Sequence, residues 1–180
     1  MSIVPTSATP PNPRQIFIVA DQFYRIIGTI LKEIMPSDTS HIRMEGDTPY
    51  KIAPIIAICA FSFELHLKCL LVIDGVAPPQ THDLEKVFAQ LSPERKREIE
   101  RRYNDARITS PTSSGEEYSM NRVLQRSKNA FNSHRYIFER PDPRLADSWL
   151  CSTLCNVVRD IIMELHPEWP PPQFAHSVQG

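Results

Sequence analysis

The residues of this chain best suited to hold a metal are its four cysteines, Cys59, Cys69, Cys151 and Cys155. Cys151 and Cys155 are four positions apart, so on a helix both side chains could face one ligand. A structural zinc site needs about four ligands, and no second cysteine or histidine pair stands at a familiar spacing. All four cysteines lie in apolar helical patterns, which favours reduced thiols packed in a core. We therefore expect no metal site and no cofactor.

Two pairs of opposite charges stand four residues apart within apolar helical segments, Glu64 with Lys68 and Arg135 with Glu139. This spacing brings each pair together on one helix face. Charges on a buried face must be partnered, so we expect the four to form a network that cross-links two helices. The alternative is a polar pocket in which the same four residues are joined by His82 and His134.

A third cluster of polar residues is basic and lies between positions 93 and 107. Its members are Arg95, Lys96, Arg97, Arg101 and Arg102. The run is typical of a solvated helix face, and the alternative is a local surface that contacts phosphate groups. The formal net charge of the chain is −1, so any contact with nucleic acid would have to depend on such a local patch.

Other chemistries have no motif in this sequence. Five scattered glycines do not make a phosphate-binding loop or a dinucleotide fingerprint. Neither a nucleophile-elbow serine nor a pair of carboxylates at a diagnostic spacing is present.

The elements that position these residues are predicted to be helices, because apolar residues recur at steps of three and four and no alternating run occurs. The first helix is expected over about 14–35, with Ile16, Ala20, Phe23, Ile27, Ile30 and Ile34 on its inner face. A second, central helix is expected from Pro49 to Gly75. Shorter helices are expected at 82–91, capped by Thr81, and at 93–107, capped by Ser92. Long helices over 118–139 and 144–165 complete an all-α bundle of four long and two shorter helices.

Prolines divide the chain into a folded body and two tails. Residues 1–13 and 167–180 are rich in proline and are expected to be disordered, which leaves a helical domain over 14–166. The N-terminal segment lacks the apolar stretch of a signal peptide, so we expect a cytoplasmic protein. The most apolar stretch, Ile52–Phe63, ends at Glu64 and is shorter than the roughly 20 residues that span a bilayer, so no membrane partner is expected.

The segment Phe63-Glu64-Leu65-His66-Leu67-Lys68-Cys69-Leu70-Leu71 is followed by a turn, by His82-Asp83-Leu84, and later by Arg135-Tyr136-Ile137-Phe138-Glu139. This series resembles the HEPN superfamily of prokaryotic helical domains, over roughly residues 49–165. The resemblance implies a small helical bundle, often dimeric, in toxin–antitoxin, abortive-infection or other defence systems. The apolar second helix also offers more surface than one small bundle can easily cover, so we expect a homodimer.

Many HEPN domains are metal-independent ribonucleases that use an Arg-x(4–6)-His motif. In that chemistry a ribose 2′-OH attacks phosphorus, the histidine moves a proton and the arginine neutralises phosphate charge. Arg159 and His166 match the spacing, with six residues between them, although His166 precedes Pro167 at a helix end. Arg126 and His134, with seven residues between them, are the second candidate pair, and His134 on an apolar stripe also fits a core histidine. Fourteen arginines and six histidines give about one match to so loose a pattern by chance.

Three functions follow from these residues. The first is a degenerate, non-catalytic HEPN-like module that binds a protein partner or RNA in a defence or stress system. The second is an active metal-independent endoribonuclease of the toxin type. The third is a structural helical adaptor whose proline-rich tails dock elsewhere. The imperfect motif favours the first.

Overall fold

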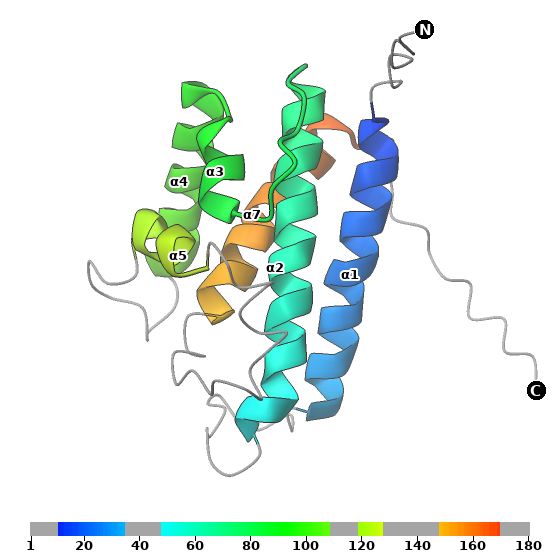
Figure 1. Cartoon of the computed structure of the whole chain (residues 1–180), viewed down its shortest axis with the longest axis vertical. Helices are drawn as coiled ribbons and strands as arrows, with labels where there is room; N and C mark the ends of the chain where they lie inside the picture. The colour runs from blue at the N-terminus through cyan, green and yellow to red at the C-terminus, as the bar shows by residue number, and fades with distance from the viewer. Residues whose placement is uncertain (1–10, 35–47, 109–118, 128–147, 170–180) are drawn as a thin grey trace, which may run out of the picture.

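The computed structural model describes residues 11–34, 48–108, 119–127 and 148–169, and it contains six helices and no strand in those ranges (Figure 1). The helices are α1 (Pro13–Ile34), α2 (Thr48–Ile73), α3 (Leu84–Ala89), α4 (Pro93–Ile108), α5 (Met120–Ser127) and α7 (Ser148–Leu165). The prediction of an all-α fold is confirmed for these residues. Of the two ends expected to be disordered, 1–13 and 167–180, residues 1–10 and 170–180 lie outside the described part.

Helices α1 and α2 run antiparallel, side by side, and α7 packs against α2, which it crosses obliquely from behind (Figure 1). α1 begins and ends within one residue of the expected bounds. Of the residues expected on its inner face, Ala20 and Ile27 are buried, and Ile16 and Ile30 are partly buried and pack against the core. Phe23 is only partly buried, and the side chain of Ile34 is outside the described part. The inner face also includes Phe17, which was not expected there.

Helix α2 is the centre of the core, as its apolar composition predicts. Leu67, Cys69, Leu70 and Leu71 have no exposed surface. The helix ends where Gly75 adopts φ 75°, with Val76 N–H donating to the Leu71 carbonyl over 2.8 Å, which is a Schellman cap that favours glycine.

The segment Pro54–Ile73 is long and apolar enough to cross a membrane, although two thirds of it, 67 %, is buried inside the protein. The sequence analysis ended the most apolar stretch before Glu64, whereas the apolar segment continues beyond that residue to Ile73. A central helix of a helical bundle has this same composition. The expectations of a cytoplasmic protein and of no membrane partner stay predictions.

The shorter helices begin at capping side chains. Asp83, and not the expected Thr81, caps α3, since its carboxylate accepts from the N–H groups of Glu85 and Lys86 over 3.1 and 3.2 Å. The Thr81 hydroxyl instead accepts from Asp83 N–H. Ser92 caps α4, as predicted, by accepting from Arg95 N–H over 3.2 Å.

The fifth predicted helix is described over α5 alone, and its continuation to 139 lies outside the described residues. α7 packs its inner face into the core and leaves its last residue, Leu165, exposed; the buried side chains are Leu154, Val157, Val158, Ile161 and Ile162. The packed chain continues past the expected boundary at His166, because the Trp169 ring lies 6.0 Å from that of Phe17. The folded body therefore extends at least to Trp169.

Candidate functional site

Arg159, the arginine of the first candidate pair, is bound to an acid on the first helix. Its Nε donates to Asp21 Oδ1 over 2.7 Å, and the Asp21 side chain has no exposed surface. Arg25 Nε donates to the other carboxylate oxygen over 2.6 Å. One buried carboxylate thus binds two guanidinium groups, so the charges of all three side chains are partnered.

The ring of Tyr24 forms a second surface against Arg159. The guanidinium carbon lies 4.8 Å from the ring centroid, within the range of a cation–π contact. Burial raises the pKa of Tyr24 above its ordinary value, against the lowering effect of the Arg159 charge. The Arg159 side chain is 15 % exposed, so most of its surface is used to join α7 to α1.

His166, the histidine of the same pair, is also engaged. Its ring stacks on Trp169, with centroids 3.9 Å apart and planes 5° from parallel. Its Nδ1 lies 2.9 Å from Glu168 Oε1, and this hydrogen bond lowers the pKa of Glu168. Arg159 lies on α7 and His166 directly follows the last residue of that helix, so about 10 Å along the axis separates their Cα atoms. Their contacts lead to different partners, so the described structure does not converge them on one point.

The second candidate pair cannot be assembled from the described residues. Arg126 lies exposed on α5. His134 is outside the described part, as are Arg135 and Glu139 of the expected charge network.

Glu64, Lys68 and His82 do meet. Glu64 is 1 % exposed, and its Oε1 accepts from Lys68 Nζ over 2.8 Å. His82 Nδ1 lies 3.2 Å from Oε1 and 3.1 Å from Oε2, so the imidazole caps the carboxylate. His82 is half-exposed, which leaves the cluster open to solvent on one side. This contact ties the turn before α3 to the middle of α2.

A further polar cluster was not anticipated from the sequence. The Ser62 hydroxyl donates to the Ala20 carbonyl over 2.9 Å, and His66 Nδ1 lies 2.8 Å from the Ser62 carbonyl. Because a carbonyl only accepts, the neutral ring carries its proton on Nδ1. Nε2 is then an acceptor, buried and without a hydrogen-bond partner in the described structure. Burial lowers the pKa of His66 to about 4, so the ring is neutral near pH 7.

The thiol of Cys155 completes this cluster, with Sγ 3.7 Å from His66 Nδ1 and 3.6 Å from the Ser62 hydroxyl. Cysteine beside histidine and serine is a combination that nucleophilic enzymes use. Here all three side chains have no exposed surface, so a substrate could not reach them. The spacing of Ser62 and His66, four residues apart on α2, was the available sequence signal, and their apolar surroundings concealed it.

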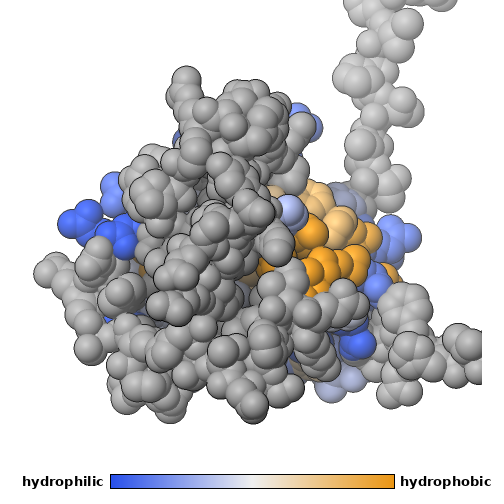
Figure 2. Space-filling model, turned by 90° about the horizontal axis from the view of Figure 1, so that it is seen from below, coloured by the Kyte–Doolittle hydropathy of each residue, from blue (hydrophilic) through white to orange (hydrophobic). Residues whose placement is uncertain are grey.

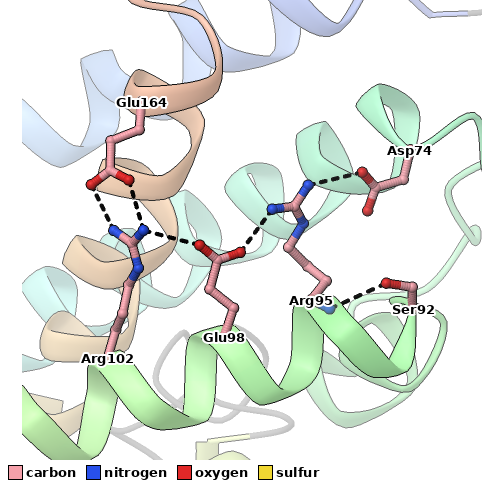
Figure 3. A network of polar contacts seen from close by, with 6 residues as sticks. All are labelled: Asp74, Ser92, Arg95, Glu98, Arg102 and Glu164. Atoms are coloured by element: carbon pink, nitrogen blue, oxygen red, sulfur yellow. Dashed lines mark hydrogen bonds and ion pairs between the residues drawn. The ribbon is translucent and has the colours of Figure 1, made fainter.

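The arginines of α4 are paired with acids. Arg102 forms a two-pronged contact with Glu164 of α7, both distances being 2.6 Å, and also donates to Glu98 over 2.9 Å (Figure 3). Arg95 donates to the same Glu98 over 2.9 Å and to Asp74, at the end of α2, over 3.1 Å (Figure 3). The hydrogen bond to Glu164 raises the pKa of Arg102, so this charge is permanent.

Two more exposed arginines of α4 are also paired with acids. Arg97 lies 3.1 Å from Glu94, and Arg101 lies 2.9 Å from Asp105. Each of these four arginines therefore faces a carboxylate of its own chain. The basic run is a charge-compensated surface, which favours the solvated helix face over the phosphate-contacting alternative.

The described residues also bear on metal binding. They hold no group of three or more histidine, cysteine, aspartate or glutamate side chains placed to bind one ion. Cys59, Cys69 and Cys155 are buried, and burial raises the pKa of the Cys69 thiol to about 12. Since the thiolate is the form that binds metal, Cys69 is a poor ligand. The side chain of Cys151 is outside the described part.

Comparison with protein families, curated proteins and solved structures finds no match to this chain. Its function has to be inferred from the contacts of its own residues. Those contacts engage both members of the Arg159 and His166 pair and neutralise the basic helix.

Proposed function

We propose that this chain is a non-catalytic, HEPN-like helical domain that binds a protein partner in the cytoplasm, within a prokaryotic defence or stress system. The Glu64, Lys68 and His82 cluster supports the HEPN-like assignment, because segments that carry the resemblance are 18 residues apart in sequence and meet at hydrogen-bond distance. In such a domain the motif residues stabilise the helical bundle and do not act on a substrate.

The observation that carries the proposal is the ion pair of Arg159 with buried Asp21. A ribonuclease arginine must face the phosphate at the moment when charge develops on it. Arg159 instead lies against a carboxylate and a tyrosine ring, where a phosphate would have to compete with an anion already in place. A misplacement of about 1 Å can cost about 100-fold in rate, so an arginine committed to structure is a poor catalyst.

A protein partner is favoured over RNA by the charges on α4. Phosphate contacts dominate affinity for nucleic acid, and each one needs an available cation. Arg95, Arg97, Arg101 and Arg102 all face acids within the chain. A surface that is neutral as a whole gives RNA little to bind.

The second candidate, a metal-independent endoribonuclease, is favoured by one observation: Arg159 and His166 stand at the spacing of the Arg-x(4–6)-His motif, with six residues between them. One assay separates the two functions. The purified chain is incubated with a mixed RNA pool in EDTA, beside Arg159→Ala, His166→Ala and His134→Ala variants. We expect no cleavage by any of them. Cleavage by the parent that is lost in His166→Ala and kept in His134→Ala would establish the nuclease and overturn the proposal.

Binding is tested directly by two measurements. Fluorescence anisotropy with labelled RNA at physiological salt should give a Kd no tighter than about 10⁻⁴ M, the weak end of non-specific binding. Co-expression with the product of each neighbouring gene, followed by size-exclusion chromatography, should yield a stable complex. Tight RNA binding without a protein complex would favour the RNA-binding alternative.

A further inference from the structure

Neighbouring apolar side chains of α1 differ in what covers them. Viewed from below, exposed apolar side chains gather on one side of the molecule (Figure 2), and Val19 and Ile26 of α1 are 46 % and 44 % exposed. Phe17, two residues before Val19, is only 1 % exposed. One of the rings packed against it comes from the far end of the described chain, since the ring centroids of Phe17 and Trp169 are 6.0 Å apart. The described chain therefore closes on itself at this position of α1.

Trp169 is placed by a turn that directly follows α7. The N–H of His166 donates to the Ile162 carbonyl over 2.9 Å, as in a continuing helix, and the N–H of Trp169 donates to the His166 carbonyl over 2.9 Å, which closes a β-turn of four residues. Pro167 occupies the second position of this turn, where its fixed φ angle is favoured. The turn brings the rings of its first and last residues into contact, with centroids 3.9 Å apart and planes 5° from parallel. We call residues 166–169 the C-terminal clasp.

The imidazole of His166 is bound to an acid of the same turn. Its Nδ1 lies 2.9 Å from Glu168 Oε1, and because an ionised carboxylate only accepts, Nδ1 carries a proton in this hydrogen bond. Nε2 is then the nitrogen that takes up a proton as pH falls. The side chain is 29 % exposed, so protons reach the ring from solvent. Protonation turns the ring into a cation that pairs with Glu168 and stacks on the face of Trp169, and both attractions are stronger for the charged ring.

The other charged groups around the clasp keep their charge near neutral pH. Of the described acids, only Glu168 lies within 4.0 Å of a His166 ring nitrogen. The neighbouring helices contribute these charged or titratable residues: Arg14 on α1, His66 on α2, Arg102 on α4 and Glu164 on α7. Arg102 and Glu164 bind each other, an arginine such as Arg14 stays charged, and burial lowers the pKa of His66 to about 4. His166 is therefore the group of the clasp whose charge changes near neutral pH.

We propose that the C-terminal clasp is a pH-sensitive device, which closes more tightly on α1 when His166 is protonated. In the closed form Trp169 packs against Phe17, and in the open form both aromatic rings gain exposure. Lower pH then favours the closed form and higher pH the open one. Aromatic side chains are favoured in protein interfaces, so the open form offers a surface that a protein partner can bind. This last step rests on the proposed binding function, whereas the clasp itself depends only on the contacts of the turn.

The test is hydrogen exchange of the Trp169 N–H in the full chain, measured by NMR at about pH 6 and about pH 8. This N–H is bonded to the His166 carbonyl in the closed turn, so its protection factor, the intrinsic exchange rate divided by the observed rate, reports the ratio of closed to open clasp. A cation–π contact and an exposed ion pair each change an equilibrium by a factor of about two to five. We expect a protection factor about threefold larger at pH 6 than at pH 8. Equal protection at the two pH values would overturn the proposal.

Two variants connect the pH dependence to His166. His166→Gln should remove it, because a glutamine side chain can still donate to Glu168 but never becomes charged. His82→Gln is the matched control, since it removes a histidine that belongs to the Glu64 cluster and should keep the threefold change. A change that persists in His166→Gln, or disappears in His82→Gln, would overturn the proposal.

Glu168→Gln covers the case in which His166→Gln fails to fold. The Glu168 side chain is 63 % exposed, so its replacement leaves the bundle and the ring stack in place. The pH dependence should then fall to about twofold or less, because only the cation–π contact remains. An unchanged threefold effect would contradict the proposed ion pair. These measurements need no partner, so a failure of the clasp is seen separately from a failure of the binding role, which co-expression tests.

Discussion

Asp21 on α1 and Arg159 on α7 form an ion pair across 138 residues of sequence, with Nε 2.7 Å from Oδ1 and the carboxylate fully buried. The pair joins the first and the last helix of the described bundle. It also uses the arginine of the first candidate catalytic pair. A structural role and a catalytic role therefore compete for the same guanidinium group.

Replacing Asp21 should be costly, because it leaves two arginines without their shared carboxylate. Breaking a buried ion pair costs about 3–5 kcal/mol, and the partial exposure of Arg159 and Arg25 reduces this, so we expect about 2–4 kcal/mol for Asp21→Asn. Urea unfolding at pH 7 measures the loss. Asp105→Asn is the control, since its pair with Arg101 is exposed and should be worth less than about 1 kcal/mol. Equal losses in the two variants would contradict the structural role of Asp21.

Removing the two partners of Glu64 one after the other should lower the free energy of unfolding in steps. Lys68→Met removes one partner of a buried carboxylate but leaves His82, so we expect a loss of about 2 kcal/mol in the free energy of unfolding. In the Lys68→Met background, His82→Ala should lower the free energy of unfolding by more than it does in the parent, because the Glu64 carboxylate then has neither partner. Thermal melting of the four proteins completes the cycle. A Lys68→Met variant that melts within a degree of the parent would show that the pair is merely solvated.

His66 makes stability depend on pH in a defined window. The folded pKa, about 4, lies below the ordinary 6.5 of a histidine in the unfolded chain. The unfolded state therefore takes up the proton first as pH falls. Stability is complete above about pH 6.5 and decreases toward pH 4, by about 2 kcal/mol at pH 5 and about 3 kcal/mol in all.

The carboxylates also titrate below pH 5, so the His66 contribution needs a difference measurement. Urea unfolding of the parent and of His66→Phe between pH 7.5 and pH 5 provides it. The variant should lose less stability than the parent over that range, whatever its stability at pH 7.5. Parallel pH profiles would mean that His66 is protonated without cost in the folded chain.

Local features of this fold were predictable because their partners are close in sequence. The bounds of α1 and α2, the Ser92 cap and the Glu64–Lys68 pair all depend on residues within about one helical turn. The cap of α3 was assigned to Thr81 in place of Asp83, two residues that both favour that position. Sequence alone does not show which of two nearby capping residues begins a helix, because the choice depends on backbone angles.

The long-range contacts were not predictable. From the sequence alone Asp21 would be taken for an exposed residue of a helix, because nothing near it in the sequence indicates its contact with Arg159. The same holds for Arg102 and Glu164, which are 62 residues apart. The burial of Asp21 on α1, beside Phe17 and Ala20, has this cause too, because it depends on a cation from α7. A single sequence contains the charges, and only the packing of distant helices decides which of them meet.

The acids that hold the α4 arginines give a last prediction, which links the ion pairs to function. Glu98→Gln with Glu164→Gln would release Arg102 from both of its carboxylates and Arg95 from one of its two, and would change the formal net charge from −1 to +1. If those acids are what keeps RNA away, the double variant should bind a labelled RNA at least about tenfold tighter than the parent. The logarithm of its binding constant should also fall more steeply with the logarithm of salt concentration, by about 0.7 for each new phosphate contact.

The matched control is Glu85→Gln with Glu168→Gln, which changes the net charge equally and lies away from these arginines. If affinity rises only in the α4 variant, local release of arginines is the cause. If it rises equally in both, overall charge is the cause. If the parent already binds RNA as tightly as the α4 variant, with the same salt dependence, the paired arginines reach phosphate after all. Charge compensation would then no longer favour a protein partner, and the basic helix would become the first place to look for an RNA surface.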